Sequence, residues 1–410
     1  YAASRVRSGK WGREMGMRQD TRPSERLQAW YRRLLRGTCS TDDYAPPPMT
    51  TATDRSSVQD PSADRSAERD PQWVRIGWWI LVVAIAARVI TALVVTQGWF
   101  FTNDDWDFLT RSSLLDSFQP HQEHINVFNT PLAIGLRSLV GLDFWPGYAL
   151  VVSVAWSTVA LAAWWAWRRR GVHPLVASGA GVLLVWLGSA SYMLFSHVNP
   201  AWAIAATIVA LEYDQMPISR RTTTIGLLFS LVAVFANTVG AVISAVRLVV
   251  SLAHRTWNGA VIAGASFAAY LVVRLLVGAG SARTSFSFSD LPDLFEISFQ
   301  LLGIGLQAVI PIPDAARGLS GVLLVVALIA FVVIRRFEYH TTAAIIGAGT
   351  WLVAAVAVKF LAWFGSAELQ RLYAPKPVFF TRFGNVVIGL AIVAVVAARP
   401  LATKWATRTS

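Results

Sequence analysis

Apolar runs long enough to cross a membrane recur in this sequence from about residue 76 to residue 398. An α-helix needs about 20 apolar residues to span the hydrocarbon of a bilayer. Charged residues make up only 15% of the chain, whereas an ordinary globular domain has about 25%. A transmembrane barrel would instead show segments of about ten residues with alternating polarity. We therefore predict an all-α fold, a polytopic transmembrane helical bundle.

Clusters of basic residues predict how the bundle is oriented. Arginines and lysines gather in short cytoplasmic loops, and such clusters follow several apolar runs here, at 168–170, 220–221, 254–255 and 335–336. Ten spans with both termini in the cytoplasm put every cluster on that side. The predicted spans are 76–97, 148–167, 174–194, 200–216, two short helices within 222–253 that turn at Asn237, 257–278, 318–334, 342–364 and 379–398.

The segment 294–313 is apolar but short, and it ends in prolines. An eleventh span there would reverse the side of every later basic cluster. We therefore predict that it forms a surface-lying or re-entrant helix on the outer side.

The ends of the chain differ from this bundle in composition. Residues 1–75 are rich in Pro, Ser, Asp and Arg and lack long apolar runs, so we predict a disordered basic cytoplasmic region. Residues 76–400 form the transmembrane domain, and residues 401–410 form a cytoplasmic tail. Met49 is an alternative start, which leaves open whether residues 1–48 are native. The net charge of +12 is explained by the cytoplasmic loops, without nucleic-acid binding.

Acids and histidines, scarce elsewhere in residues 76–400, gather in the predicted first external loop. "TNDDWDFL" at 102–109 carries Asp104 and Asp105, and "HQEHINVF" at 121–128 carries His121, Glu123 and His124. A carboxylate near the hydrocarbon boundary is partly desolvated, which suits a general base. An ordinary solvated loop is the alternative. We predict interfacial helices at 105–118 and 126–142. These groups could also bind Mg²⁺ or Mn²⁺, so no cofactor is certain and metal dependence stays open.

Basic residues near the outer ends of later spans are the second signal. Arg274, Lys359 and Arg382 are predicted to face a cavity or a partner, because a charge in lipid is costly. Together with Arg371 and Lys376, which belong to the last external loop or to an ordinary solvated loop, they could surround an anionic group such as a phosphate. The planar guanidinium fork is well suited to phosphate. Arg247 lies near the cytoplasmic side, and we predict that it snorkels. Asn199 either lines the same outer cavity or caps a helix.

The layout resembles the GT-C superfamily of integral membrane glycosyltransferases that use polyprenyl-phosphate sugars. The matching features are the first span followed at once by "NDDWDFL", then "HQEHINVF", then "GLDFWPGYAL", and a last external loop that leads into "FFTRFGNVV". Relatives often have an Arg-Tyr pair at that last position, whereas Arg382 is followed here by Phe383. The resemblance covers residues 76–400 in layout and only part of that range in motif.

The resemblance implies a bacterial enzyme of the plasma (inner) membrane with its active site on the outer face. A sugar would move from a polyprenyl phosphate to an envelope glycan, lipid or protein, with inversion of configuration. Either Asp105 or Asp104 would be the general base, and His121, Glu123 and His124 would position the acceptor. The residues that stabilise the leaving lipid phosphate would be Arg274, Lys359 and Arg382.

Two other classes compete with this interpretation. A transporter or lipid flippase would explain the intramembrane charges but not the acids beside the first span. The sequence also shows no internal repeat of the kind that transporters often carry. A catalytically silent scaffold that binds a partner through the N-terminal region is the other alternative.

Overall fold

The computed structural model describes residues 71–97, 103–118, 127–187, 194–278, 287–307, 309–357 and 377–398. Within these ranges, the side chains of residues 71, 103–105, 144, 194–197 and 377–383 are not described. Every regular element in the described ranges is a helix, so the predicted all-α class is confirmed.

A helix coincides with each of the ten predicted spans. These helices are α3 (Pro71–Val95), α6 (Ala149–Arg169), α7 (Pro174–Leu187), α8 (Leu194–Asp214), α9 (Arg220–Ala236), α10 (Thr238–Ala253), α11 (Trp257–Val277), α13 (Arg317–Ile334), α14 (Tyr339–Ala355) and α16 (Pro377–Ala397).

Four helices in the described part of the chain are long and apolar enough to cross a membrane. They cover Gln72–Val95, Trp145–Arg169, Trp257–Val277 and Asp314–Ile334. Large apolar side chains on α11 and α13 point outward; Leu275 and Leu276, for example, are 82% and 81% exposed. Contiguous apolar surface is unusual on a soluble monomer and is typical of helices that face lipid.

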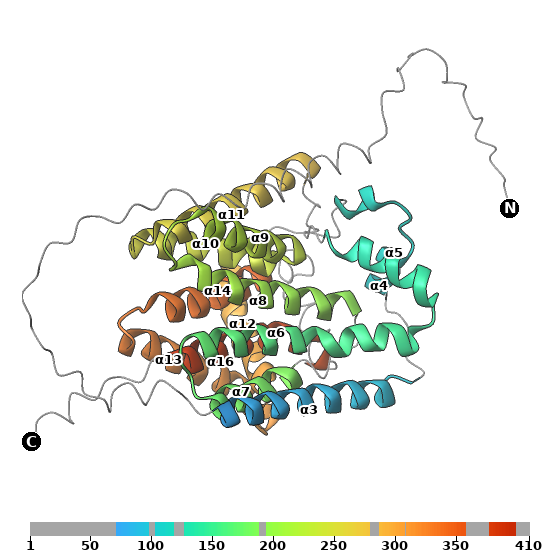
Figure 1. Ribbon diagram of the computed structural model, residues 1–410, viewed down its shortest axis with the longest axis horizontal. Helices are drawn as coiled ribbons and strands as arrows, with labels where there is room; N and C mark the ends of the chain where they lie inside the picture. The colour runs from blue at the N-terminus through green and yellow to red at the C-terminus, as the bar shows by residue number, and fades with distance from the viewer. Residues whose placement is uncertain are drawn as a thin grey trace, which may run out of the picture. The chain divides into compact units, whose positions relative to one another are not determined.

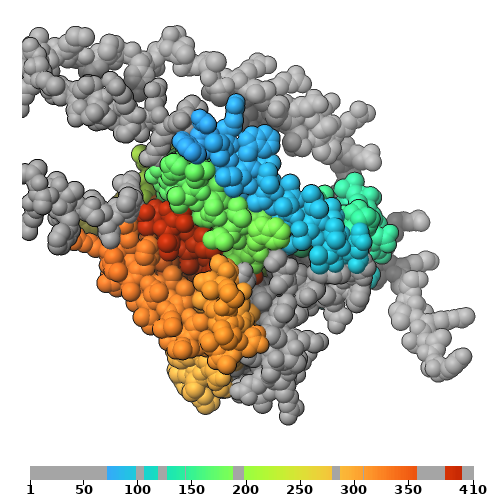
Figure 2. All heavy atoms as spheres, turned by 90° about the horizontal axis from the view of Figure 1, so that it is seen from below, coloured from blue at the N-terminus to red at the C-terminus, as the bar shows by residue number. Residues whose placement is uncertain are grey.

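The helices pack into one bundle around α6 and α8. Helix α8 packs against α6 and α9, α3 against α7, and α10 against both α11 and α14 (Figure 1). On the face shown in Figure 2, α3, α7, α16 and the orange α13 follow one another across the surface. Large aromatic side chains fill the interior. Trp167, which is fully buried, donates a hydrogen bond of 3.1 Å from Nε1 to the carbonyl oxygen of Val393, and so joins α6 to α16.

The predicted turn at Asn237 is confirmed. Helix α9 ends at Ala236, and the side chain of Asn237 accepts a hydrogen bond from the backbone N–H of Val239, which starts α10. A side chain at Gly240 would collide with the carbonyl of Ala233, so only glycine allows the two helices to meet this closely.

Helix α12 (Leu291–Gln307) covers most of the segment predicted to be surface-lying or re-entrant, and it is not surface-lying. One side of it is buried against α13 and α16. A Cβ atom at Gly305 would collide with the backbone of Gly384 on α16, and one at Gly303 with the backbone of Arg317. Glycines thus let α12 approach two neighbours at backbone contact, and the helix belongs to the packed bundle.

The segment between α3 and α6, predicted to be the first external loop, contains short helices. They are α4 (Asn103–Leu109), the 3-10 helix η1 (Leu114–Phe118), α5 (Asn129–Val140) and the single turn η2 (Phe144–Tyr148). Helix α5 lies within the predicted range 126–142, whereas the predicted helix 105–118 is divided into α4 and η1. Figure 1 shows α4 and α5 together at one end of the bundle. We call this the α4 end; the opposite end, where α6 finishes at Arg169, is the Arg169 end.

Candidate functional site

The acid-bearing helix α4 begins eight residues after the end of α3. Asp104 and Asp105 lie in its first turn, and their side chains are outside the described set. Phe108 and Leu109, each 2% exposed, anchor the helix. Helical spacing puts position 105 on the same face as positions 108 and 109.

Two arginines hold α4 in place. Arg137 on α5 donates a hydrogen bond of 2.5 Å from Nη1 to the carbonyl oxygen of Leu109 at the end of α4. Arg111 lies with its guanidinium 4.9 Å from the ring centre of Phe108 and donates to the carbonyl oxygen of Asp116 at 2.7 Å. Partial burial lowers the pKa of Arg111, and the nearby Asp116 and Asp107 counteract part of that effect. The helix is therefore fixed by charged donors as well as by packing.

Two further contacts join the loop to the bundle. The indole Nε1 of Trp145 donates a hydrogen bond of 2.8 Å to the carbonyl oxygen of Leu93, near the end of α3. The backbone N–H of Val127 donates to the carbonyl oxygen of Phe235 at 3.1 Å, next to the turn between α9 and α10. His121, Glu123 and His124 lie outside the described residues, but the segment that carries them ends at this contact.

The structure describes the three predicted cations to different extents. Arg274 lies in the last turn of α11, with its Nη1 buried and without a hydrogen-bond partner. Arg382 belongs to α16, but its side chain is not described, and Lys359 lies outside the described residues. Helix α11 packs on α8, α9 and α10, whereas α16 packs mainly on α12 and α14 and also contacts α6, α7 and α8. The predicted grouping of these cations around one phosphate therefore stays a prediction.

Three buried asparagines toward the α4 end of the bundle have side-chain amide atoms without a hydrogen-bond partner. Asn199 on α8 is 2% exposed, and its Oδ1 has no partner. Asn385 on α16 donates to the carbonyl oxygen of Leu187 at 2.7 Å, but its Oδ1 is also unsatisfied. Asn129, at the start of α5, is 1% exposed with neither amide atom bonded. Buried polar atoms are usually paired, so these are candidates for ligand or water contacts. Sequence reasoning named Asn199 and missed the other two.

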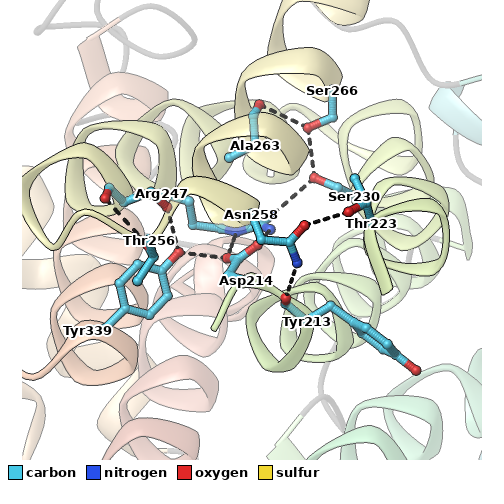
Figure 3. A network of polar contacts seen from close by, with 11 residues as sticks. Tyr213, Asp214, Thr223, Ser230, Arg247, Thr256, Asn258, Ala263, Ser266 and Tyr339 are labelled. Atoms are coloured by element: carbon cyan, nitrogen blue, oxygen red, sulfur yellow. Dashed lines mark hydrogen bonds and ion pairs between the residues drawn. The ribbon is translucent and has the colours of Figure 1, made fainter. Parts of the chain in front are cut away.

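A second polar cluster occupies the bundle interior (Figure 3). Arg247 on α10 is fully buried and donates two hydrogen bonds to Asp214 on α8, at 2.9 and 2.6 Å. The hydroxyl of Tyr339 donates to the same carboxylate at 2.7 Å, and Arg247 also donates to Ser230 at 3.0 Å. The two charged side chains of this cluster, Arg247 and Asp214, neutralise each other.

The prediction that Arg247 snorkels is wrong. The side chain cannot extend toward water because the bidentate bond to Asp214 holds it in the core. The sequence contained a sign of this pairing: Arg247 lies inside one apolar run and Asp214 lies at the end of another. Such charges are costly alone, so pairing between helices was the alternative to snorkelling.

A polar pocket of about 430 Å³ opens near this cluster, between the ends of α6, α8, α14 and α16. It lies at the Arg169 end of the bundle. The residues that line it are Arg169, Arg170, Glu212, Gln215, Met216, Glu338, His340 and Ala397. The sequence interpretation treated the Arg168–Arg170 run only as a topology marker.

Within the described part of the chain, no three His, Cys, Asp or Glu side chains lie together in a way that could hold a metal ion. His121, Glu123 and His124 do not belong to that part of the chain.

Comparison with protein-family models, with curated proteins and with solved structures finds no match to this chain.

Proposed function

We propose that this chain is a membrane glycosyltransferase that moves a sugar from a polyprenyl phosphate to an extracytoplasmic acceptor. The observation that carries the proposal is the acid-bearing helix α4, which directly follows the first membrane-length helix and is fixed to the end of the bundle. A rigid carboxylate at that position could meet a headgroup that rises from the lipid. Rigid positioning of this kind is what a general base requires.

The proposed orientation has ten spans, with both termini in the cytoplasm and the α4 end outside. The ten spans are supported by the helix that coincides with each of them, including the four of membrane length. The orientation is supported by the basic clusters at 168–170, 220–221, 254–255 and 335–336. The shorter α7, with 14 residues, would be about 21 Å long and would need adjoining residues to complete its crossing. The proposed location is the inner membrane of a bacterium.

The proposed reaction is a single displacement. The acceptor hydroxyl oxygen attacks the anomeric carbon while its proton passes to an aspartate carboxylate. The bond from that carbon to the phosphate oxygen breaks, the lipid phosphate takes the electron pair, and the configuration inverts. Asp105 is the preferred base, because position 105 shares a helix face with the buried Phe108 and Leu109. Asp104 is the alternative.

The leaving phosphate gains negative charge as the bond breaks, so fixed cations would stabilise the transition state. We assign this part to Arg274, Lys359 and Arg382. The buried Nη1 of Arg274, which has no partner, supports its inclusion. The acceptor would be positioned by His121, Glu123 and His124, whose segment is fixed at Val127. Should a divalent cation be required, these last three residues are its candidate ligands.

The test is a set of acid substitutions in membranes supplied with labelled lipid-linked sugars. Asp105→Asn should lower sugar transfer by about 10²- to 10⁴-fold, the usual contribution of a general base. Asp143→Asn is the matched control, because Asp143 is an exposed acid in the same loop. If transfer survives both Asp105→Asn and Asp104→Asn, the proposed mechanism is wrong. Lipid scrambling without any transfer would favour the flippase.

A further inference from the structure

The pocket at the Arg169 end of the bundle has no part in the proposed reaction. One positive charge remains there when Arg335, which pairs with Glu338 from outside the lining, is counted. Arg170 and Glu212 form an ion pair at 2.6 Å, and Glu338 pairs with Arg335 at the same distance. Both acids in the lining are thus neutralised by arginines. Arg169 is the remaining cation, and within the described residues no acid forms an ion pair with it.

Arg169 is held by aromatic rings. Its guanidinium carbon lies 4.8 Å from the ring centre of Trp165 and 6.0 Å from that of Tyr213. Stacking on aromatic faces uses the flat side of a guanidinium and leaves its N–H groups free to donate in the plane. The arginine is therefore oriented without its donors being consumed.

The other polar groups of the pocket do not alter this charge balance. His340 donates to or accepts from Gln215 at 2.8 Å. Neither side chain adds a formal charge when histidine is counted as neutral at pH 7. Arg169 and Arg170 balance Glu212 and Glu338 within the lining, and the neighbouring Arg335 leaves one excess positive charge in and beside the pocket.

We propose that this pocket binds a phosphate diester, a singly charged anion, through Arg169. A diester matches the single excess charge in and beside the pocket, whereas a monoester carries nearly two negative charges and would keep one of them uncompensated. The volume of about 430 Å³ lies within the usual range for small-ligand sites. In the proposed orientation the pocket opens at the level of the inner-leaflet headgroups, where basic pockets between helices bind anionic lipids.

The shape of the site supports a headgroup whose tail stays outside the bundle. A crevice leads inward from the pocket and shares Arg170, Glu212 and His340 with it. Its volume is only about 20 Å³, enough for about one water molecule. An acyl chain therefore cannot enter there and would remain in the surrounding lipid.

The experiment uses the purified full chain, delipidated in a neutral detergent. Added phosphatidylglycerol should raise the temperature of unfolding by about 3 °C, whereas phosphatidylcholine should not. Arg169→Gln should abolish the shift. Arg168→Gln should keep it, because Arg168 donates to the carbonyl oxygen of Val172 and does not line the pocket. Arg169→Lys should keep part of the shift, since lysine retains the charge but has no planar guanidinium to stack on Trp165 and Tyr213.

The outcomes separate the sources of the phosphate. An equal shift with soluble glycerophosphoglycerol supports the diester site and identifies a soluble ligand. An equal shift in Arg169→Gln, or with phosphatidylcholine, overturns the proposal. Native mass spectrometry of the wild type gives a test that needs no variant: phosphatidylglycerol should remain bound after phosphatidylcholine is lost, and equal retention of the two would contradict the site. These results do not depend on sugar transfer.

Discussion

The α4 end and the buried Asp214–Arg247 cluster are both rich in polar residues, but their hydrogen bonding differs. In the cluster, the carboxylate of Asp214 accepts three hydrogen bonds from Arg247 and Tyr339, and the surrounding serines bond to one another. Toward the α4 end, Asn129, Asn199 and Asn385 keep unsatisfied buried atoms. Satisfied groups stabilise a fold, whereas unsatisfied ones are available to a ligand. We therefore expect substitutions in the cluster to change stability and substitutions at the α4 end to change activity.

The largest effect on stability should come from Arg247→Ala. It leaves the carboxylate of Asp214 buried without its partner, and breaking such a pair costs about 3–5 kcal/mol. Thermal unfolding in detergent should detect this as a large fall in the midpoint. A midpoint within about 2 °C of the wild type would show that the Asp214–Arg247 cluster contributes little to the stability of the fold.

The double substitution Arg247→Met with Asp214→Leu separates the effect of losing the ion pair from the effect of leaving one charge buried alone. Replacing a buried ion pair by apolar side chains of similar size is often neutral or stabilising, because both desolvation costs disappear. We expect the double variant to unfold within about 1 kcal/mol of the wild type and to retain sugar transfer. Loss of transfer in a stable double variant would mean that the ion pair takes part in function.

Tyr339→Phe should have a smaller effect. The hydroxyl donates to Asp214 and lies 2.8 Å from the hydroxyl of Ser251, and a hydrogen bond to a charged group contributes about 1.5–3 kcal/mol. Urea titration followed by tryptophan fluorescence should give a loss of about 2 kcal/mol. Ser266→Ala, at the far side of the cluster, is the matched control and should cost less, because Ser266 bonds no charged group directly.

The smallest effect on stability, and a clear effect on activity, is expected for Arg137→Ala. The substitution removes the donor to the carbonyl of Leu109 and loosens α4 without exposing the bundle core. We expect a global loss of about 1 kcal/mol or less. Transfer should fall by roughly tenfold, since misplacing a catalytic group by about 1 Å can cost up to a hundredfold. Normal transfer with reduced stability would mean that the α4 end serves stability, which we assign to the Asp214–Arg247 cluster, and not activity.

Helix positions could be predicted from the sequence because apolar runs, basic clusters and the Asn237 turn are local signals. The packing of α12 could not, because it depends on contact between Gly305 and Gly384, which are distant in the chain. The pairing of Arg247 with Asp214 was missed for a similar reason: each charge looks isolated within its own apolar run. The pocket at Arg169 combines four chain segments, and no single one of them signals it.

The most direct measurement of the central claim is sugar transfer by the purified chain reconstituted in vesicles with labelled polyprenyl-phosphate sugars. The account predicts that the label leaves the lipid, appears in the acceptor with inverted anomeric configuration, and does so at similar rates in the wild type and the Arg247→Met, Asp214→Leu double variant. In Asp105→Asn the rate should fall by at least about 100-fold. Absence of transfer from every donor, or an unchanged rate in both Asp105→Asn and Asp104→Asn, would contradict it.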